Sequence, residues 1–337
     1  MNLPSPNPVL VEVRRGDVVE SFHRGAVAVA DAAGRLVAAW GDTARPVYPR
    51  SALKPVQALA LVETGAWGAY GLGTEELALA AASHAGSAIH TDRVAGWLRH
   101  IGLGAEALEC GGHAPSDPAA SRALAASDSP PSPLHNNCSG KHAGFLTVAR
   151  HLRVPTRGYI RRDHPVQNLV AGAIGAMSGC VPVTAAPCGI DGCGIPVFAL
   201  PLAGLAAAMA RMAAPGGFPA SRRAAAREIV AAMLSHPHLV AGRGRLCTEF
   251  MRAIPRIALK GGAEGVYVAI VPERGWGVAV KIDDGAGRAA EVAILAVLRR
   301  LGLLAREDLD RLAARVAPPL LNVAGRRVGE IRATEWL

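Results

Sequence analysis

The sequence lacks long hydrophobic runs, blocks of basic residues and a secretory leader, and each absence excludes a class of protein. No run approaches the roughly 18 uninterrupted apolar residues of a membrane span. Residues 1–8 are polar and proline-rich, unlike a secretory signal, so we expect a cytoplasmic protein. The net charge is +9, but the lysines and arginines are scattered and follow no nucleic-acid-binding spacing. We therefore expect a basic surface that attracts small anionic or zwitterionic substrates, and no nucleic-acid partner.

Cysteines and aromatic residues are also scarce. Aromatic residues make up 4% of the chain, whereas alanine and glycine are abundant, which favours a compact, tightly packed protein. Six cysteines in 337 residues are too few and too spread for a disulfide framework. In a reducing compartment they are packing residues, nucleophiles or metal ligands. They are Cys110, Cys138, Cys180, Cys188, Cys193 and Cys247.

Strand patterns occur near both ends of the sequence and helical patterns lie between them. Alternating residues predict strands over 9–14, 18–22, 25–30 and 35–40, and a hairpin over 265–282. We expect these strands to form one antiparallel sheet in an α+β fold, as in serine β-lactamases and penicillin-binding proteins. The prediction is a single domain, with a sheet subdomain over about 9–48 and 255–337 and a helical subdomain over about 49–254.

The clearest catalytic motif is Arg50-Ser51-Ala52-Leu53-Lys54, at the start of a helix predicted over residues 51–63. One helical turn separates the serine from the lysine, so Ser51 and Lys54 can meet on one face. A desolvated lysine can remove the serine proton and so create a nucleophile. Alone the motif is weak, because the same spacing occurs on many solvent-exposed helices.

A second lysine and a second serine extend this motif. Lys260-Gly261-Gly262 precedes the strand predicted from Val266, and its glycines allow a close approach of substrate or backbone. Ser83 follows a helix predicted over 74–82 and could relay a proton or act as the nucleophile. The alternatives are an exposed lysine in a glycine-rich turn and a polar residue that caps the next helix.

A polar cluster over residues 135–142 precedes a helix predicted from Lys141, and a helix N-terminus suits a carboxylate or an oxyanion. Further along, Cys188 and Cys193 flank Asp191. Thiolates with nitrogen donors could bind zinc, although no Cys-x-x-Cys or His-x-His pair is present. The alternative is that these thiols are buried and pack as small hydrophobic side chains.

Five motifs, in this order, resemble the asparaginase II family of serine–lysine asparaginases over nearly the whole chain. The resemblance implies hydrolysis of L-asparagine to L-aspartate and ammonia, a fold similar to serine β-lactamases, and a homodimer. The motifs are Arg50-Ser51-x-x-Lys54, Ser83-His84-x-Gly86, His135 to His142, Asp191-Gly192-Cys193 and Lys260 to Gly265.

The resemblance also implies roles for single residues. Ser51 with Lys54 forms one serine–lysine pair and Ser83 with Lys260 a second, and we expect Ser51 to form the acyl-enzyme with Lys54 as its base. Lys260 would tune Ser83 or relay protons to it. The implied substrate-binding residues are Arg50, Asn137, His142 and Asp191, and the implied zinc ligands are Cys138, Lys141 and Cys193. The chain departs from related enzymes where a glycine, in place of a hydroxyl residue, follows Lys260, and Cys188 is an extra thiol.

Two rival functions remain open at this point. A glutaminase, a β-lactam hydrolase or a peptidase of the same fold would share Ser51, Lys54 and Lys260 but would not need the cysteine–lysine cluster. An amino-acid or zinc-binding module would bind its ligand without turning it over. The sequence leaves open the nucleophile, the preference between asparagine and glutamine, the role of zinc and the dimer interface.

Overall fold

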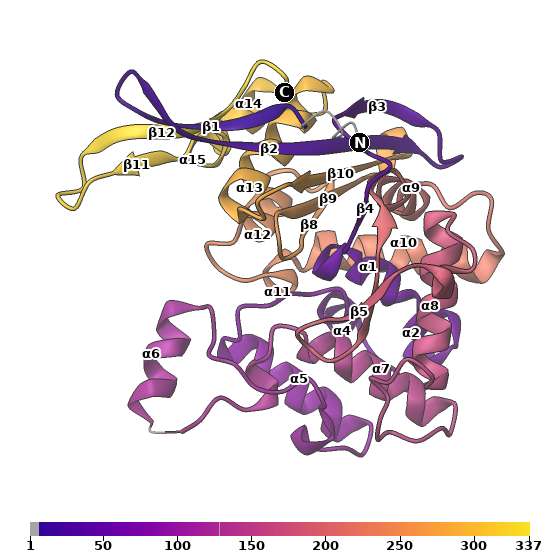
Figure 1. The fold of residues 1–337 in the computed structure, drawn as a ribbon. Coiled ribbons are helices and arrows are strands. Elements are labelled where there is room, and N and C mark those ends of the chain that lie inside the picture. Colours follow the sequence, from indigo (N-terminus) through magenta and orange to yellow (C-terminus); the bar gives the residue numbers. More distant parts are fainter. Residues whose placement is uncertain (1–6, 128) are drawn as a thin grey trace.

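The computed structural model describes residues 7–127 and 129–337. Strands from both ends of the sequence share one antiparallel sheet, in the order β11-β12-β1-β2-β10-β9-β8, with β3 paired to β2 (Figure 1). The predicted α+β class is thereby confirmed. The strands are β1 (Val9–Arg15), β2 (Val18–Asp31), β3 (Leu36–Trp40), β8 (Ala258–Gly261), β9 (Val266–Val271), β10 (Trp276–Ile282), β11 (Pro319–Leu321) and β12 (Arg327–Ala333).

Strand β2 is continuous where the sequence pattern suggested two strands. Its first half pairs with β1, and its second half pairs with β10 on one side and β3 on the other. The change of partner falls near Gly25, where an added Cβ would lie 2.4 Å from the Lys281 carbonyl oxygen. Glycine there lets the backbone of β10 approach closely, so β2 passes from one group of strands to the other without a break.

Two helices pack against the centre of the sheet. Helix α9 (Leu202–Ala213) contacts β2, β9 and β10, and α13 (Gly287–Arg300) contacts β1, β9, β10 and β12. Gly277 of β10 allows α9 to approach, because a Cβ there would lie 2.1 Å from the Ala206 carbonyl oxygen. Every residue of β9 is buried, so both faces of this strand are covered.

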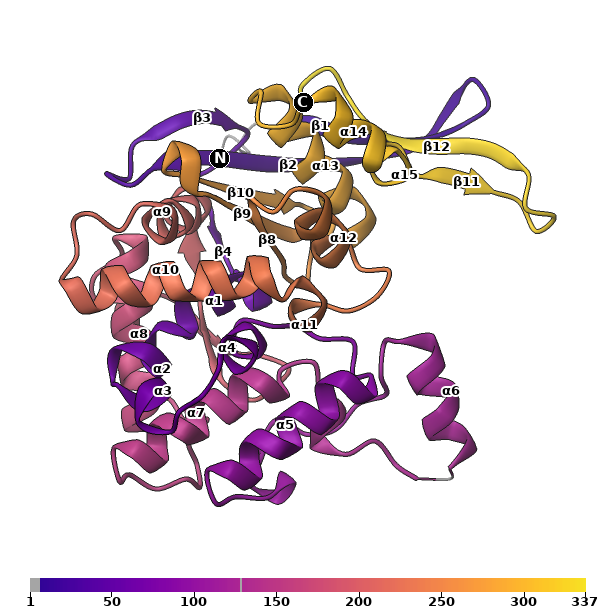
Figure 2. The same ribbon diagram turned by 180° about the vertical axis from the view of Figure 1, so that it is seen from behind.

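Most of the helices between residues 59 and 240 lie at one side of the sheet, with α7 (Ser139–His151) among them (Figure 2). Helix α7 is buried from Ser139 through Ala149 and contacts α2, α3, α4, α5 and α8. Gly140 lets α4 approach, because a Cβ would lie 2.5 Å from the Leu79 carbonyl oxygen. The helices of this group are α2 (Leu59–Glu63), α3 (Ala66–Ala69), α4 (Thr74–Ala80), α5 (Ala88–His100), α6 (Pro118–Ala126), α8 (Pro165–Ser178), α10 (Ala220–Ser235) and α11 (Pro237–Val240). Elsewhere, α12 (Leu246–Ala253) contacts β8, and α15 (Ala313–Val316), next to α14 (Arg306–Arg311), contacts α13.

The helix predicted over 51–63 is interrupted. It comprises a 3-10 turn, η1 (Arg50–Leu53), then α1 (Lys54–Gln57) and α2. Pro55 lies in the first turn of α1, where its missing N–H leaves no helical hydrogen bond unmade. The predicted subdomain boundaries stay a prediction. Among the described residues, no helix combines the length and apolar character needed to cross a membrane.

Candidate active site

Ser83 lies in the loop after α4, between two segments that are distant in the sequence. Its backbone N–H donates to the Val240 carbonyl at 2.9 Å, and the next N–H, that of His84, donates to the Asn137 carbonyl at 3.2 Å. The Ser83 hydroxyl oxygen accepts from Lys54 Nζ at 2.9 Å and from Lys260 Nζ at 2.8 Å. A single hydroxyl therefore joins the two lysines that the sequence motifs single out.

Both lysines are buried, which is rare for this residue type and points to a functional site. Lys54 also donates to the Ala82 carbonyl at 2.5 Å, and burial lowers the pKa of its amine. Lys260 lies on the edge strand β8 and donates to the Gly261 carbonyl at 2.7 Å. Burial and the neighbouring Lys54 lower the pKa of Lys260 to about 7. A neutral Lys260 amine can therefore exist here near neutral pH.

Ser51 faces the same pocket as Ser83. A cavity of about 260 Å³ is lined by Ser51, Ser83, Asn137 and Lys260, among others. Within the described residues the Ser51 hydroxyl makes no hydrogen bond, and the Lys54 amine donates to Ser83 and not to Ser51. The Ser83–Lys260 pair is thus present as a hydrogen bond, and the Ser51–Lys54 pair is not. The choice of Ser51 as nucleophile stays a prediction.

The residue before Ser51 is held in an unusual backbone conformation. Arg50 has φ of 51°, in the left-handed region that costs a non-glycine residue about 1–3 kcal/mol. Its guanidinium Nε donates to Asp191 Oδ1 at 2.7 Å, and both side chains are mostly buried. This ion pair anchors the turn that presents Ser51 to the cavity.

The other predicted substrate-binding residues lie in different environments. Asn137 lines the cavity, and its side-chain oxygen accepts from the Cys138 thiol at 3.1 Å. His142 is fully buried in α7, with Nδ1 2.7 Å from the Tyr159 hydroxyl and, among the residues that the structure describes, no hydrogen-bond partner at Nε2. Neither His142 nor the paired Arg50 and Asp191 is among the residues that line the cavity. Their substrate-binding roles stay predictions.

The three implied zinc ligands converge in the interior, next to Lys54. Lys141 Nζ donates to Cys193 Sγ at 3.0 Å, and Cys138, Lys141 and Cys193 are all buried. A hydrogen bond with Cys193 lowers the pKa of the Cys138 thiol, with Lys141 and Lys54 acting in the same direction. Although burial opposes it, the adjacent thiols raise the pKa of Lys141 to about 12.

This donor set fits a zinc ion chemically. In the described part of the chain, no three His, Cys, Asp or Glu side chains cluster closely enough to hold a metal, so the amine of Lys141 would be the third protein ligand. Thiolates and nitrogen donors are the ligands that zinc prefers, and binding would displace the protons of the thiols and of the amine. The thiol of Cys188 instead lies 3.5 Å from the Gly189 carbonyl.

Gly262 sets the distance between β8 and the turn that carries Ser51. An added Cβ would lie 2.8 Å from the Pro49 carbonyl oxygen and 3.1 Å from the Ala52 nitrogen. Gly262→Ala is therefore expected to move Ser51 relative to Lys260 and lower kcat/KM about 10-fold or more, because small displacements in a reacting geometry are costly. Amide turnover by Gly262→Ala and by the control Gly217→Ala, whose Cβ would contact nothing within 4 Å, checks this. Equal activity in both variants would contradict it.

Sequence reasoning missed several residues that line the cavity. Arg245, from the loop before α12, and Glu291, on α13, both line it, together with Cys247 and Tyr267. The Tyr267 hydroxyl lies 3.3 Å from the Cys247 sulfur. A single exposed arginine and a half-buried glutamate in a helix carry no motif, so only the folded arrangement brings them to the two serines.

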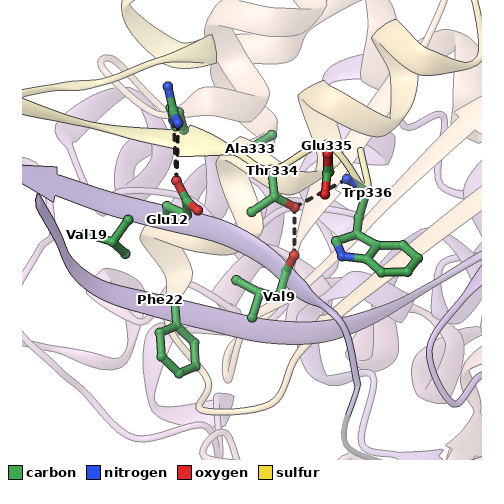
Figure 3. A pocket seen from close by; sticks show the side chains of 9 residues that line it. Val9, Glu12, Val19, Phe22, Ala333, Thr334, Glu335 and Trp336 are labelled. Atoms are coloured by element: carbon green, nitrogen blue, oxygen red, sulfur yellow. Dashed lines mark hydrogen bonds and ion pairs between the residues drawn. The ribbon is translucent and has the colours of Figure 1, made fainter. Parts of the chain in front are cut away.

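A larger pocket, of about 670 Å³, lies over the outer strands β1, β2 and β12 (Figure 3). Glu12 pairs with Arg332 at 3.4 Å there, and the Thr334 hydroxyl donates to the Val9 carbonyl at 2.6 Å. No serine, cysteine or lysine is among the described residues that line it. The smaller cavity is therefore the one with the chemical groups of a nucleophilic enzyme.

Comparison with known proteins gives the family. Among curated protein sequences, none matches the chain. Similar solved structures include a β-lactamase from Mycobacterium bovis (17% identity, TM-score 0.41, covering 82% of this chain and 94% of that one). Another is Mglu (17% identity, TM-score 0.45, covering 88% of this chain and 72% of that one). Both TM-scores are low, so the assignment rests on the family model described as L-asparaginase II, which matches residues 11–333. The chain belongs to the L-asparaginase II family.

Proposed function

We propose that the protein hydrolyses L-asparagine to L-aspartate and ammonia through an acyl-enzyme. Its family is one of amidohydrolases. The observation that carries the proposal is the buried Lys54–Ser83–Lys260 chain, which borders the same cavity as Ser51. Turnover of an amide requires a nucleophile, a base and an acid for the departing ammonia, and these four side chains supply all three. A binding module would have no use for two buried lysines joined by one hydroxyl.

In this proposal the Ser51 oxygen attacks the side-chain carbonyl carbon of asparagine, and neutral Lys54 takes the Ser51 proton. The carbon–nitrogen bond then breaks, and the nitrogen leaves as ammonia with a proton that Ser83 hands over. A lysine ammonium then returns a proton to Ser83 along the Lys54–Ser83–Lys260 hydrogen bonds. Water then attacks the resulting ester, which releases L-aspartate and restores the Ser51 hydroxyl.

Ammonia release tests the proposal directly. Purified protein is assayed with L-asparagine, L-glutamine and a β-lactam, with and without added zinc. Turnover of asparagine ahead of the other two substrates is the expected result. Faster turnover of glutamine or of the β-lactam would support the rival hydrolases, and stabilisation by asparagine without ammonia release would support a binding module.

We also propose that Cys138, Lys141 and Cys193 hold a zinc ion, which would supply a fixed positive charge beside the catalytic lysines. Cys138→Ala is expected to lose bound zinc and to lower, but not abolish, turnover. The matched control is Cys188→Ala, which removes a half-buried thiol that lies outside the cluster. Metal content by elemental analysis checks this. Equal zinc content in both variants would contradict the assignment.

The expected homodimer and the expected cytoplasmic location stay predictions. Light scattering of the purified protein at micromolar concentration measures the first, and cell fractionation measures the second.

A further inference from the structure

The cavity that Ser51 and Ser83 line also carries charged residues of both signs on its wall. Glu291 is the one acidic residue among the described residues that line it, and Arg245 and Lys260 are the basic ones. Lys260 is already held by Ser83 and the Gly261 carbonyl. Arg245 and Glu291 are therefore the charged groups that remain for a ligand.

The side chain of Arg245 is exposed, and within the described part of the chain its guanidinium makes no hydrogen bond or ion pair. Among the described residues the Glu291 carboxylate makes one ion pair, with Arg315 at 3.8 Å, which is too long for a hydrogen bond, and Arg245 is a second cation near it. Arg315 makes its short contacts elsewhere, to Glu249 at 2.7 Å and to the Gly244 carbonyl at 2.6 Å. Both groups thus keep their hydrogen-bonding capacity for a molecule in the cavity.

The sequence suggested that Arg50 and Asp191 hold the charged ends of the substrate, but in the structure these two side chains contact each other. Arg50 and Asp191 bind each other at 2.7 Å, and neither lines the cavity. An α-amino acid carries a carboxylate and an ammonium group on one carbon, so its site needs a cation and an anion close together. Arginine matches a carboxylate with two parallel N–H donors, and glutamate accepts from an ammonium group.

We propose that Arg245 binds the α-carboxylate and Glu291 the α-ammonium group of the amide substrate. The inference rests on the proposed amidohydrolase function and deepens it by naming the two side chains that bind the α-amino-acid end of the substrate. Peptides and N-acylated amino acids lack one of the two charges, so this pair disfavours them.

Two truncated substrates separate the two contacts. Succinamate is asparagine without its α-ammonium group, and 3-aminopropanamide is asparagine without its α-carboxylate. Wild type is expected to prefer asparagine to each by about 10- to 100-fold in kcat/KM, the size of one charge-assisted hydrogen bond. Glu291→Gln should lose the preference over succinamate alone, and Arg245→Met should lose the preference over 3-aminopropanamide alone.

Two control variants exclude indirect effects. Glu249→Gln removes the other carboxylate that contacts Arg315 but does not line the cavity, and Arg243→Met removes an exposed arginine two residues before Arg245. Both should keep the wild-type preferences. If Glu291→Gln and Arg245→Met turn over asparagine and keep the wild-type preferences, the binding roles of these two residues are wrong. The proposed amidohydrolase function is unaffected by that result. A wild type that releases no ammonia from any of the three amides would instead overturn the proposed function.

Discussion

Ser51→Ala is expected to lower kcat for L-asparagine by about 10⁴-fold or more, the loss typical of a missing nucleophile. Ser83→Ala should cost about 10²- to 10⁴-fold, the usual contribution of general acid–base catalysis. The reason for the difference lies in the contacts. The Ser51 hydroxyl faces the cavity without a hydrogen bond among the described residues, whereas Ser83 is held by two lysines. Ser51→Ala should also leave the free energy of unfolding nearly unchanged.

Rates alone do not distinguish a nucleophile from a proton relay, so the decisive experiment is covalent labelling of the nucleophile. A diazo ketone analogue of asparagine is reacted with the wild type and both variants, and the modified peptide is identified by mass spectrometry. The adduct is expected on Ser51 in wild type and in Ser83→Ala, and to be absent from Ser51→Ala. An adduct on Ser83 would reverse the two roles and make Ser83 the nucleophile, with Lys54 and Lys260 on either side of it.

Lys260→Met is expected to lower kcat/KM by about 10²-fold or more and to change its pH dependence. Lys54 and Lys260 contact one hydroxyl, so their titrations are linked, and the pKa of Lys260 lies at about 7. Below that pH Lys260 is protonated, so it cannot accept a proton that passes through Ser83. Wild-type kcat/KM should therefore rise with pH through about 7. Without Lys260 the like-charge repulsion on Lys54 disappears, and the rise should move to higher pH.

Stability gives a second measurement that does not depend on turnover. The pKa of Lys260 is lowered by burial from its ordinary value of 10.5 to about 7. Between these values the unfolded chain binds more protons than the folded one, so the free energy of unfolding increases with pH across that window. Denaturation of wild type and Lys260→Met from pH 7 to 10 should show a steeper increase in wild type, because Lys54, whose pKa is also lowered, remains in the variant. Parallel curves, or a kcat/KM that is flat through pH 7, would contradict the assignment.

The sequence predicted the sheet well because alternating apolar residues and tight turns are local signals. The hairpin of β9 and β10, and the union of the terminal strands, follow from them. The proline- and serine-rich stretch over 111–133 contains a helix that the strand and helix patterns above do not include: α6 begins where Asp117 accepts from the Ala120 N–H and Pro118 occupies the first turn. A short exposed helix buries little apolar surface, so its periodicity is weak.

The sequence predicted which residues form much of the site, but not how their side chains contact one another. Motif spacing brought out Ser51, Lys54, Ser83 and Lys260, but the direction in which each amine points depends on the carbonyls of other segments. Lys54 turns towards the Ala82 and Asn137 carbonyls and so meets Ser83. Arg245 and Glu291 approach the serines through the packing of α12 and α13 near β8 and β9, which leaves no pattern in the local sequence.

The pairing of β1 with β12 has a consequence for biosynthesis. Val11 lies opposite Ala333, and Arg15 opposite Gly329, so β1 is synthesised long before the strand that it pairs with. Contacts of such high sequence separation slow folding and leave an unpaired strand edge exposed in the meantime. Ser51, Lys54 and Ser83 emerge early, but β8 with Lys260 follows much later. The nascent chain therefore gains Lys260 and the pairing of β1 with β12 only after most of the helices have been made, and that earlier stage is where chaperones have most to protect.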